Sequence, residues 1–428
     1  MIRALGARWF DAVLLAVALS GLSLVFAPAV TGYLVVAHVS GALQRLSLLN
    51  NVQWTVLRRE QGWFQTQLHT QLTVAEYAPV QVQLELVHGP IYLGMLERQR
   101  SPFLMAYLRA VPSGPRDDAP RFQATLQFNG DWSAQLDRQD LVLRGLDDSS
   151  VITITLRALR ADIGYAARLP ALAVRAAAER GDLGNDGVHA QLIDLAMLGE
   201  YRLDSSGWLF GDTSLRVASI VHSPTQGRVS GFELAASSTE NGASAAASIA
   251  LRAESSEFLE RDFGGVELDA TARNVSLSGL RSWFHRSDSF SARALQSLSA
   301  NANLRLSRLT IRDREGASLV RARATARIAP AETSHDTRLS LDLSASRAFS
   351  EFVFWHGAKR TLGRSALFGE LNELDDAEQS AVARTSATKQ LSVLAARGYL
   401  TWNRGWYHTR VTLDAGKWAL NGRPVNVR

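Results

Sequence analysis

The tripeptide His88-Gly89-Pro90 is the first candidate for a chemical site in this sequence, because histidine can perform acid–base chemistry or bind a metal ion. The imidazole of His88 could act as a general base or as a metal ligand, because histidine changes charge near neutral pH. No second histidine or carboxylate stands at ligand spacing, and His69 lies far back along the chain. Glycine followed by proline is typical of a sharp turn. The sequence therefore favours a turn at His88 over a catalytic or metal site.

Three pairs of adjacent aspartates could supply the two carboxylates of an acid–base dyad: Asp117-Asp118, Asp147-Asp148 and Asp375-Asp376. The first two pairs fall in predicted loops, and the third begins a predicted helix as part of a capping box with Glu378. The sequence has no His-Glu-x-x-His, Gly-x-Ser-x-Gly, P-loop or dinucleotide-binding pattern. We therefore predict no catalytic, cofactor-binding or metal-binding residues and no enzymatic activity, with a hydrolase site assembled from distant residues as the less favoured alternative.

The distribution of charge and the absence of cysteine argue against some classes of partner and ligand. The formal charge is +5, but the arginines are scattered singly among acids and do not form the basic stripe that binds nucleic acid. The chain has no cysteine, which excludes disulfides and thiolate metal sites. We therefore expect no cofactor and no nucleic-acid partner.

Alternation of apolar and polar residues dominates the chain from about residue 52, which predicts antiparallel strands with one wet face. The clearest apolar runs are Val82, Leu84 and Leu86; Phe122, Ala124, Leu126 and Phe128; Ile152, Ile154 and Leu156; Leu304 and Leu306; Val320, Ala322, Ala324, Ala326 and Ile328; and Leu339, Leu341 and Leu343. Turn residues between the runs, such as Asn129-Gly130, Asn241-Gly242 and Asn421-Gly422, predict hairpins, so that consecutive strands pair as a meander. Residues 166–197 are ambiguous, because their alanines suit a helix while their glycines interrupt it.

Helical patterns are concentrated late in the chain, near residues 289–298 and 346–397. In the second range Phe349, Phe352 and Val353 share a face at helical spacing, and Gly398 stands where a left-handed stop is expected. The predicted fold is mainly β with a helical insertion, in a large antiparallel sheet that is curved or sandwich-like. We expect one extracytoplasmic domain over residues 41–428.

Residues 12–37 contain no charged side chain and, at about 1.5 Å of rise per residue, are long enough to cross a bilayer as a helix. Arg3 and Arg8 precede this segment and only Arg45 follows closely, so residues 1–40 are predicted to form a cytoplasmic N-terminus and a transmembrane anchor, with the body in the periplasm. The alternative is a signal peptide cleaved at Ala27-Pro28-Ala29, although the apolar run continues beyond that point.

Three segments together resemble the bacterial YdgA-like family, an inner-membrane group of unknown function. They are residues 54–66, with Arg58, Arg59, Gly62, Trp63, Phe64 and Thr66; His88-Gly89-Pro90; and the C-terminal Gly398, Gly416, Asn421-Gly422 and Pro424. Trp63 and Gln65 depart from the family's smaller residues. The resemblance implies an inner-membrane location and this architecture, and it assigns no activity.

We therefore expect a single-pass bacterial inner-membrane protein of the cell envelope, anchored by its N-terminal helix, whose amphipathic sheet binds lipid. Amphipathic strands with few helices leave apolar surface that must be closed or filled. The alternative is a structural or assembly module that binds another envelope protein through an edge strand.

Overall fold

The computed structural model describes residues 33, 52–62, 64–74, 80–88, 104–112, 122–147, 150–185, 188–203, 209–223, 227–258, 261–277, 299–328, 337–364, 376–414 and 417–425. Of the predicted membrane segment only Tyr33 is described, and it is helical and exposed. The rest of that segment and the helix predicted near residues 289–298 lie outside the described residues. Within the described residues, no helix combines the length and the apolar character that a membrane span requires.

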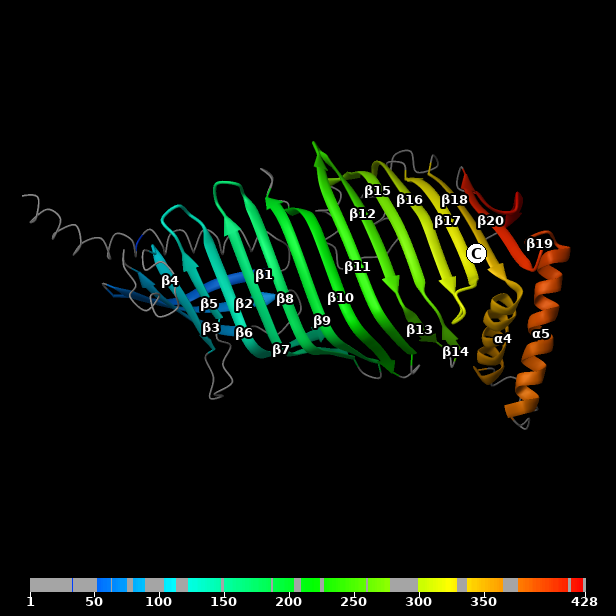
Figure 1. Cartoon of the computed structure of the whole chain (residues 1–428), viewed down its shortest axis with the longest axis horizontal. Coiled ribbons are helices and arrows are strands. Elements are labelled where there is room, and N and C mark those ends of the chain that lie inside the picture. The colour runs from blue at the N-terminus through cyan, green and yellow to red at the C-terminus, as the bar shows by residue number, and fades with distance from the viewer. Residues whose placement is uncertain are drawn as a thin grey trace, which may run out of the picture. The chain divides into compact units, whose positions relative to one another are not determined.

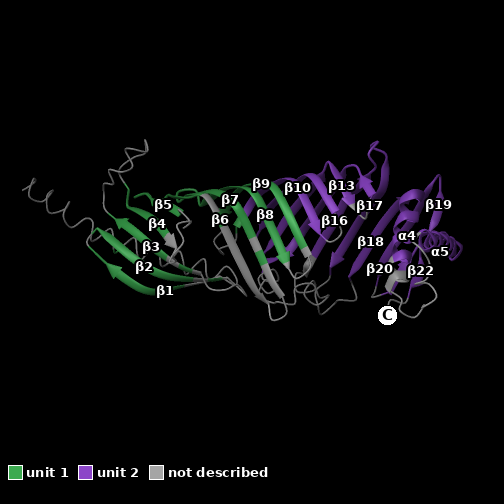
Figure 2. Ribbon diagram, turned by 90° about the horizontal axis from the view of Figure 1, so that it is seen from below, with its two compact units in different colours: residues 1–209 green, residues 210–428 purple. Residues whose placement is uncertain are grey.

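The chain divides into two compact units, residues 1–209 and residues 210–428, which Figure 2 colours separately. Strands make up most of the described chain, so the predicted mainly β fold is confirmed. The strands form a large open antiparallel sheet, as expected, and the helices expected over residues 346–397 follow late in the chain. The single extracytoplasmic domain expected over residues 41–428 stays a prediction.

The first unit is an antiparallel meander in which each strand pairs with the next (Figure 1). Its strands are β1 (Val52–Gln61), β2 (Gln65–Val74), β3 (Val80–His88), β4 (Ala106–Pro112), β5 (Phe122–Leu126), β6 (Trp132–Asp147), β7 (Ser150–Ala166), β8 (Ala171–Asn185) and β9 (Val188–Leu203). The alternation around Leu84 and Leu86 is confirmed as β3. Phe128 does not continue β5: it lies in the turn at Asn129-Gly130 and is exposed.

The core of the first unit lies on one face of β2, β3 and β4. Leu68 and Leu86 are 1% and 0% exposed, and they pack with Leu84, Ala106 and Ala110. In β2 and β3 the alternate residues are more exposed, as expected when one face of a sheet is buried and the other is wet. In β4 Tyr107, on the opposite face, is also buried. Period-two patterning therefore decides which side chains form this core.

The ambiguous residues 166–197 form strands, not a helix. They belong to the end of β7, to β8 and to most of β9, which pair in long antiparallel ladders. Gly181 is buried in β8, where an added Cβ would lie 3.2 Å from the Leu156 side chain and 3.4 Å from that of Leu192. Close packing between strands thus requires a small residue at this position. Helix propensity, which depends on neighbours in sequence, does not include this requirement.

The second unit contains β10 (Leu209–Ser223), β11 (Gly227–Asn241), β12 (Ser244–Ala253), β13 (Ser255–Phe258), β14 (Arg261–Phe263), β15 (Val266–Ser276), β16 (Ser299–Arg312), β17 (Ser318–Ile328), β18 (Arg338–Ser346), β19 (Thr401–Asn403), β20 (Trp406–Asp414), β21 (Lys417–Leu420) and β22 (Arg423–Val425). Its central ladder runs β12, β15, β16, β17, β18 and β20, all antiparallel. Asn421 and Gly422 both have positive φ, so the predicted hairpin turn between β21 and β22 is confirmed.

Two helices, α4 (Arg347–Arg364) and α5 (Asp376–Ala396), follow β18 within the predicted range 346–397. The Ser346 hydroxyl caps α4 by accepting a hydrogen bond from the Phe349 N–H, and Gly398 ends α5 at φ +71°. Phe349 and Phe352 pack against Phe263, each with ring centroids 5.9 Å apart. Val353 stands one helical turn after Phe349 and is exposed, so it takes no part in this packing.

Candidate functional site

His88 ends β3 inside the first unit, where it is 2% exposed. Its Nε2 lies 3.0 Å from Oγ1 of Thr66, which is itself fully buried, and its backbone N–H donates to the Phe64 carbonyl. No group of three or more acidic or histidine side chains that could hold a metal ion is found in the described part of the chain. Both side chains are buried, so neither faces solvent from which a substrate could approach. The turn predicted at His88-Gly89-Pro90 stays a prediction, because Gly89 and Pro90 lie outside the described residues.

The acid pairs are not brought together within the described residues. Asp117, Asp118, Asp148 and Asp375 lie outside the described residues. Asp147 ends β6 opposite Ser150, and Asp376 is the first residue of α5. The two described aspartates therefore lie at the end of a strand and at the start of a helix, and neither is part of a carboxylate dyad among the described residues.

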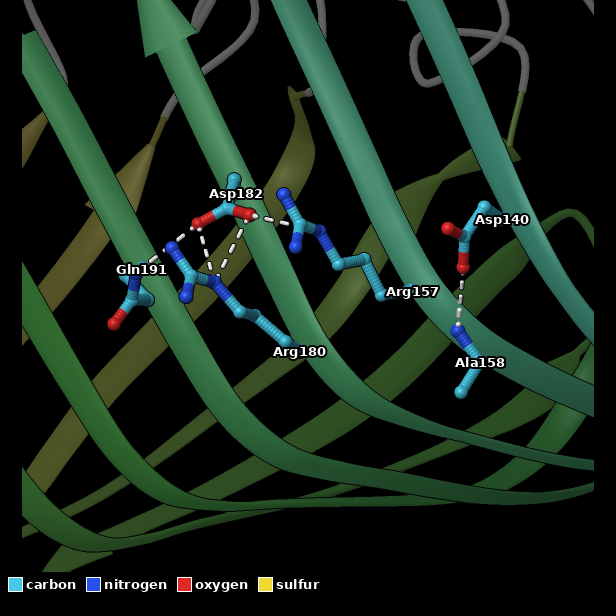
Figure 3. Close-up of polar contacts among 6 residues, drawn as sticks. All are labelled: Asp140, Arg157, Ala158, Arg180, Asp182 and Gln191. Atoms are coloured by element: carbon cyan, nitrogen blue, oxygen red, sulfur yellow. Dashed lines mark hydrogen bonds and ion pairs between the residues drawn. The ribbon is translucent and has the colours of Figure 1, made fainter.

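A polar cluster around Asp182 lies on the sheet of the first unit, as Figure 3 shows. The Asp182 carboxylate accepts hydrogen bonds of 2.9 and 3.0 Å from Arg180 Nε and one of 3.1 Å from Gln191 Nε2. Arg157 Nε of the neighbouring strand lies 3.8 Å away. The cluster joins β7, β8 and β9 across one face of the sheet.

Beside this cluster a backbone irregularity interrupts the ladder between β6 and β7. Ala158 has φ +51°, and its N–H donates a 2.9 Å hydrogen bond to Asp140 Oδ1 (Figure 3). Positive φ is unfavourable for alanine, and the side-chain acceptor compensates for a lost ladder bond. The register of β6 against β7 shifts at this point.

The environment of Asp182 favours its charged form. Burial alone would raise the pKa of Asp182, but the hydrogen bonds from Arg180 and Gln191 and the charges of Arg180 and Arg157 together lower that pKa below its ordinary value. A carboxyl whose pKa is lower in the folded state stabilises the fold above its unfolded pKa. That contribution is lost as the pH falls through the folded pKa.

We expect Asp182→Asn to lower the free energy of unfolding at neutral pH by up to about 1 kcal/mol, as for a partly exposed ion pair. The difference from wild type should shrink as the pH falls below about 4, where the wild-type carboxyl also becomes neutral. Urea unfolding of both proteins at the two pH values measures this. Asp137→Asn, at an exposed position of β6, is the control; an Asp182→Asn effect that grows toward acid would contradict the expectation.

One face of β15, β16, β17, β18 and β20 in the second unit is apolar. Antiparallel register aligns its side chains in four cross-strand rows, from the α4 end outward: Val266, Ile311, Val320 and Ala345; Leu268, Leu309, Ala322 and Leu343; Ala270, Leu306, Ala324, Leu341 and Val411; Ala272, Leu304, Ala326, Leu339 and Leu413. We call the last two rows the open apolar rows.

Helix α4 covers only one end of this face. Phe349 and Phe352 pack on Phe263 and Val320, and the row residues Val320 and Ala322 are 5% and 4% exposed. In the open apolar rows no side chain reaches that degree of burial, and Leu304 is 37% exposed. The face therefore changes from a packed core under α4 to a partly solvent-exposed apolar surface beyond it.

The opposite face of the same strands is charged. Arg308 pairs with Asp269 at 2.6 Å and with Glu267 at 3.1 Å, and Arg410 pairs with Asp342 at 2.5 Å. Cross-strand pairs of opposite charge stabilise adjacent strands modestly when they are exposed. The sheet is thus amphipathic as the alternation predicts, with ion pairs on its wet face.

Sequence reasoning did not identify the Asp182 cluster or the cross-strand ion pairs. Arg180 and Asp182 stand two residues apart in a strand, which does place both on one face. Their partners Arg157 and Gln191 come from β7 and β9, and only strand register brings them near. The spacing of Arg180 and Asp182 was therefore the one sign of this cluster in the sequence. Many solvated strands show the same spacing, so it does not identify a functional cluster.

Comparison with known protein families matches residues 11–428 to a model described as "Bacterial protein of unknown function (DUF945)". No curated protein and no solved structure matches the chain. The expected match to a bacterial family of unknown function is therefore confirmed.

Proposed function

The chain belongs to the bacterial DUF945 family, whose function is unknown, so we propose its function from its own residues: it is an envelope protein that binds lipid acyl chains on the open apolar rows of residues 210–428. In this proposal residues 12–37 anchor it in the inner membrane, with the body in the periplasm, and its role is binding without catalysis. We also propose that its family is the YdgA-like group.

The observation that carries the proposal is the uneven cover of the apolar face. In the first two rows Val320 and Ala322 are buried, and Ile311, Leu343 and Ala345 pack in the same cluster as the phenylalanines of α4. In the open apolar rows no residue is buried, and Leu304 is 37% exposed. Each square ångström of apolar surface removed from water contributes about 25 cal/mol. Acyl chains are unbranched and flexible, so they can follow a flat row of short side chains that offers few hydrogen-bond partners.

Lipid contact with this face is tested by photo-crosslinking, because a membrane anchor would retain lipid by itself. The full chain, purified in detergent with a lipid that carries a photoactivatable group on its acyl chain, should give crosslinked peptides from β16, β17 and β18. Ala324→Asn places an amide on an open apolar row and should weaken binding roughly tenfold, since a poorly satisfied buried polar group costs about 1–3 kcal/mol.

The matched control is Arg323→Asn, the preceding residue, whose side chain lies on the charged face of the same strand. It receives the same new residue and should keep the wild-type crosslinking yield. Crosslinks confined to residues 12–37, or equal losses in both variants, would refute acyl-chain binding on the sheet.

A second candidate function, binding of another envelope protein by strand addition, is favoured by strand β1. Within the described residues β1 pairs only with β2, and its residues from Thr55 onward are exposed. A bulge at Leu57 and the charges of Arg58, Arg59 and Glu60 protect this edge, as natural edge strands require. Crosslinking in cells from β1 positions that captures one defined protein would favour this candidate.

A further inference from the structure

A hollow of about 780 Å³ lies at one end of the central ladder of the second unit. Figure 1 shows the strands that carry its lining residues, β15, β16, β17, β18 and β20, side by side. It is lined by four arginines, Arg273, Arg305, Arg327 and Arg338, and by one acidic residue, Asp414. Its volume falls in the range of pockets that hold small molecules. The side chains that line it therefore carry a net charge of +3, four cations less one anion.

Strand register concentrates these cations. Arg273 is paired with Asn303, Asn303 with Arg327, and Arg327 with Arg338, so three arginines occupy one cross-strand row. Adjacent strands lie only about 4.8 Å apart, and like charges directly opposite one another are destabilising. The repulsion between these arginines lowers the stability of the sheet, and a bound anion would offset that repulsion.

The arginines are not all neutralised by the protein. Arg338 forms a 3.3 Å ion pair with Asp414, and Arg327 has an interaction of its own. For Arg273 and Arg305 the described residues contain no hydrogen-bonding or ion-pairing partner. These two guanidinium groups are available to a ligand.

Hydroxyl groups complete the donor set. Thr271 is paired with Arg305, Arg305 with Thr325, Thr325 with Ser340, and Ser340 with Thr412, in a second cross-strand row that also lines the hollow. A guanidinium fork matches two oxygens of a phosphate group, and hydroxyls donate to the remaining oxygen. Hydrogen-bond donors of the arginines and hydroxyl groups outnumber the acceptors in the lining of the hollow, as binding of an oxyanion requires.

We propose that this hollow binds a phosphate group, either a free phosphate or the headgroup of an anionic phospholipid, through Arg273 and Arg305. Four residues of the open apolar rows, Leu304, Ala326, Leu339 and Leu413, also line the hollow. The phosphate would be bound by the arginine and hydroxyl side chains, which are different groups from those proposed to contact acyl chains. A carboxylate would satisfy fewer of the donors, since it offers two oxygens where a phosphate monoester offers three.

Isothermal titration of the detergent-solubilised full chain tests the site with three probes: inorganic phosphate, short-chain phosphatidic acid and short-chain phosphatidylcholine. Phosphate or phosphatidic acid should bind more tightly than phosphatidylcholine, whose choline offsets the phosphate charge. Arg273→Gln combined with Arg305→Gln should weaken binding roughly tenfold or more, because each removes a charge-assisted hydrogen bond. Lysine at both positions should restore part of the affinity, since it keeps the charge without the fork.

The control variant combines Arg216→Gln with Arg384→Gln, two exposed arginines that are not in the hollow, and should bind as wild type. Binding of both phosphate and phosphatidic acid supports a general phosphate site. Binding of phosphatidic acid alone identifies a lipid headgroup, and binding of phosphate alone identifies a soluble source. No binding to the wild-type chain, or equal weakening in the control variant, would overturn the proposal.

Discussion

Gly264→Ala should lower the free energy of unfolding of the second unit by about 3 kcal/mol or more, because overpacking against rigid backbone cannot relax. Gly264 joins β14 to β15, and its N–H donates a 2.8 Å hydrogen bond to the Arg312 carbonyl. A Cβ added there would lie 2.0 Å from the carbonyl oxygen of Asp313. The turn beside it would have to move, which would disturb the β15–β16 ladder. Thermal unfolding followed by circular dichroism measures the effect.

Gly357→Ala is the control, and it is expected to change stability in the opposite direction. Gly357 lies inside α4, where an added Cβ would meet nothing within 4 Å. Alanine is favoured over glycine in a helix interior by roughly 0.5–1 kcal/mol, so Gly357→Ala should raise the unfolding temperature. If both alanines shift the midpoint in the same direction, the close approach at Gly264 does not determine stability.

Leu86→Ala should destabilise the first unit by about 2–5 kcal/mol, the usual cost of a cavity left by a fully buried leucine. Leu86 is 0% exposed and packs with Leu68, Leu84, Ala106 and Ala110. The measurement is urea unfolding, with hydrogen exchange of β2, β3 and β4 amides to assign the loss to this unit.

Leu169→Ala is the matched control, since Leu169 is 76% exposed in the turn between β7 and β8. Its effect should stay within about 0.5 kcal/mol, as for most surface substitutions. Equal effects at the two leucines would mean that the core on β2, β3 and β4 is not what holds this unit together.

The features of the fold that could be predicted are those that local pattern determines. The alternation at Val320 to Ile328 yields β17, Gly398 ends α5, and Asn421-Gly422 makes its turn. Each depends on residues close in sequence, whose preferences follow from sterics and side-chain direction.

What could not be predicted depends on partners far along the chain. Residues 166–197 have the alanine content of a helix, yet cross-strand packing makes them strands. The same holds for the hollow: the alternating arginines of β17 predict a wet face, but not that Arg273 and Arg305 would come to lie beside them on that face. Register is a tertiary property, and a shift of one residue would reverse every side chain.

The consecutive pairing of β1 to β9 has a kinetic consequence. Because each strand of that unit pairs with its sequence neighbour, its contacts are local, and relative contact order is low for a sheet. Most pairings close short connections, and the longest, between β3 and β4, spans residues 89–105. The entropy of loop closure therefore accumulates in small steps, because its cost grows only slowly with loop length. The unit can therefore grow hairpin by hairpin as the chain emerges from synthesis, without waiting for its last strand.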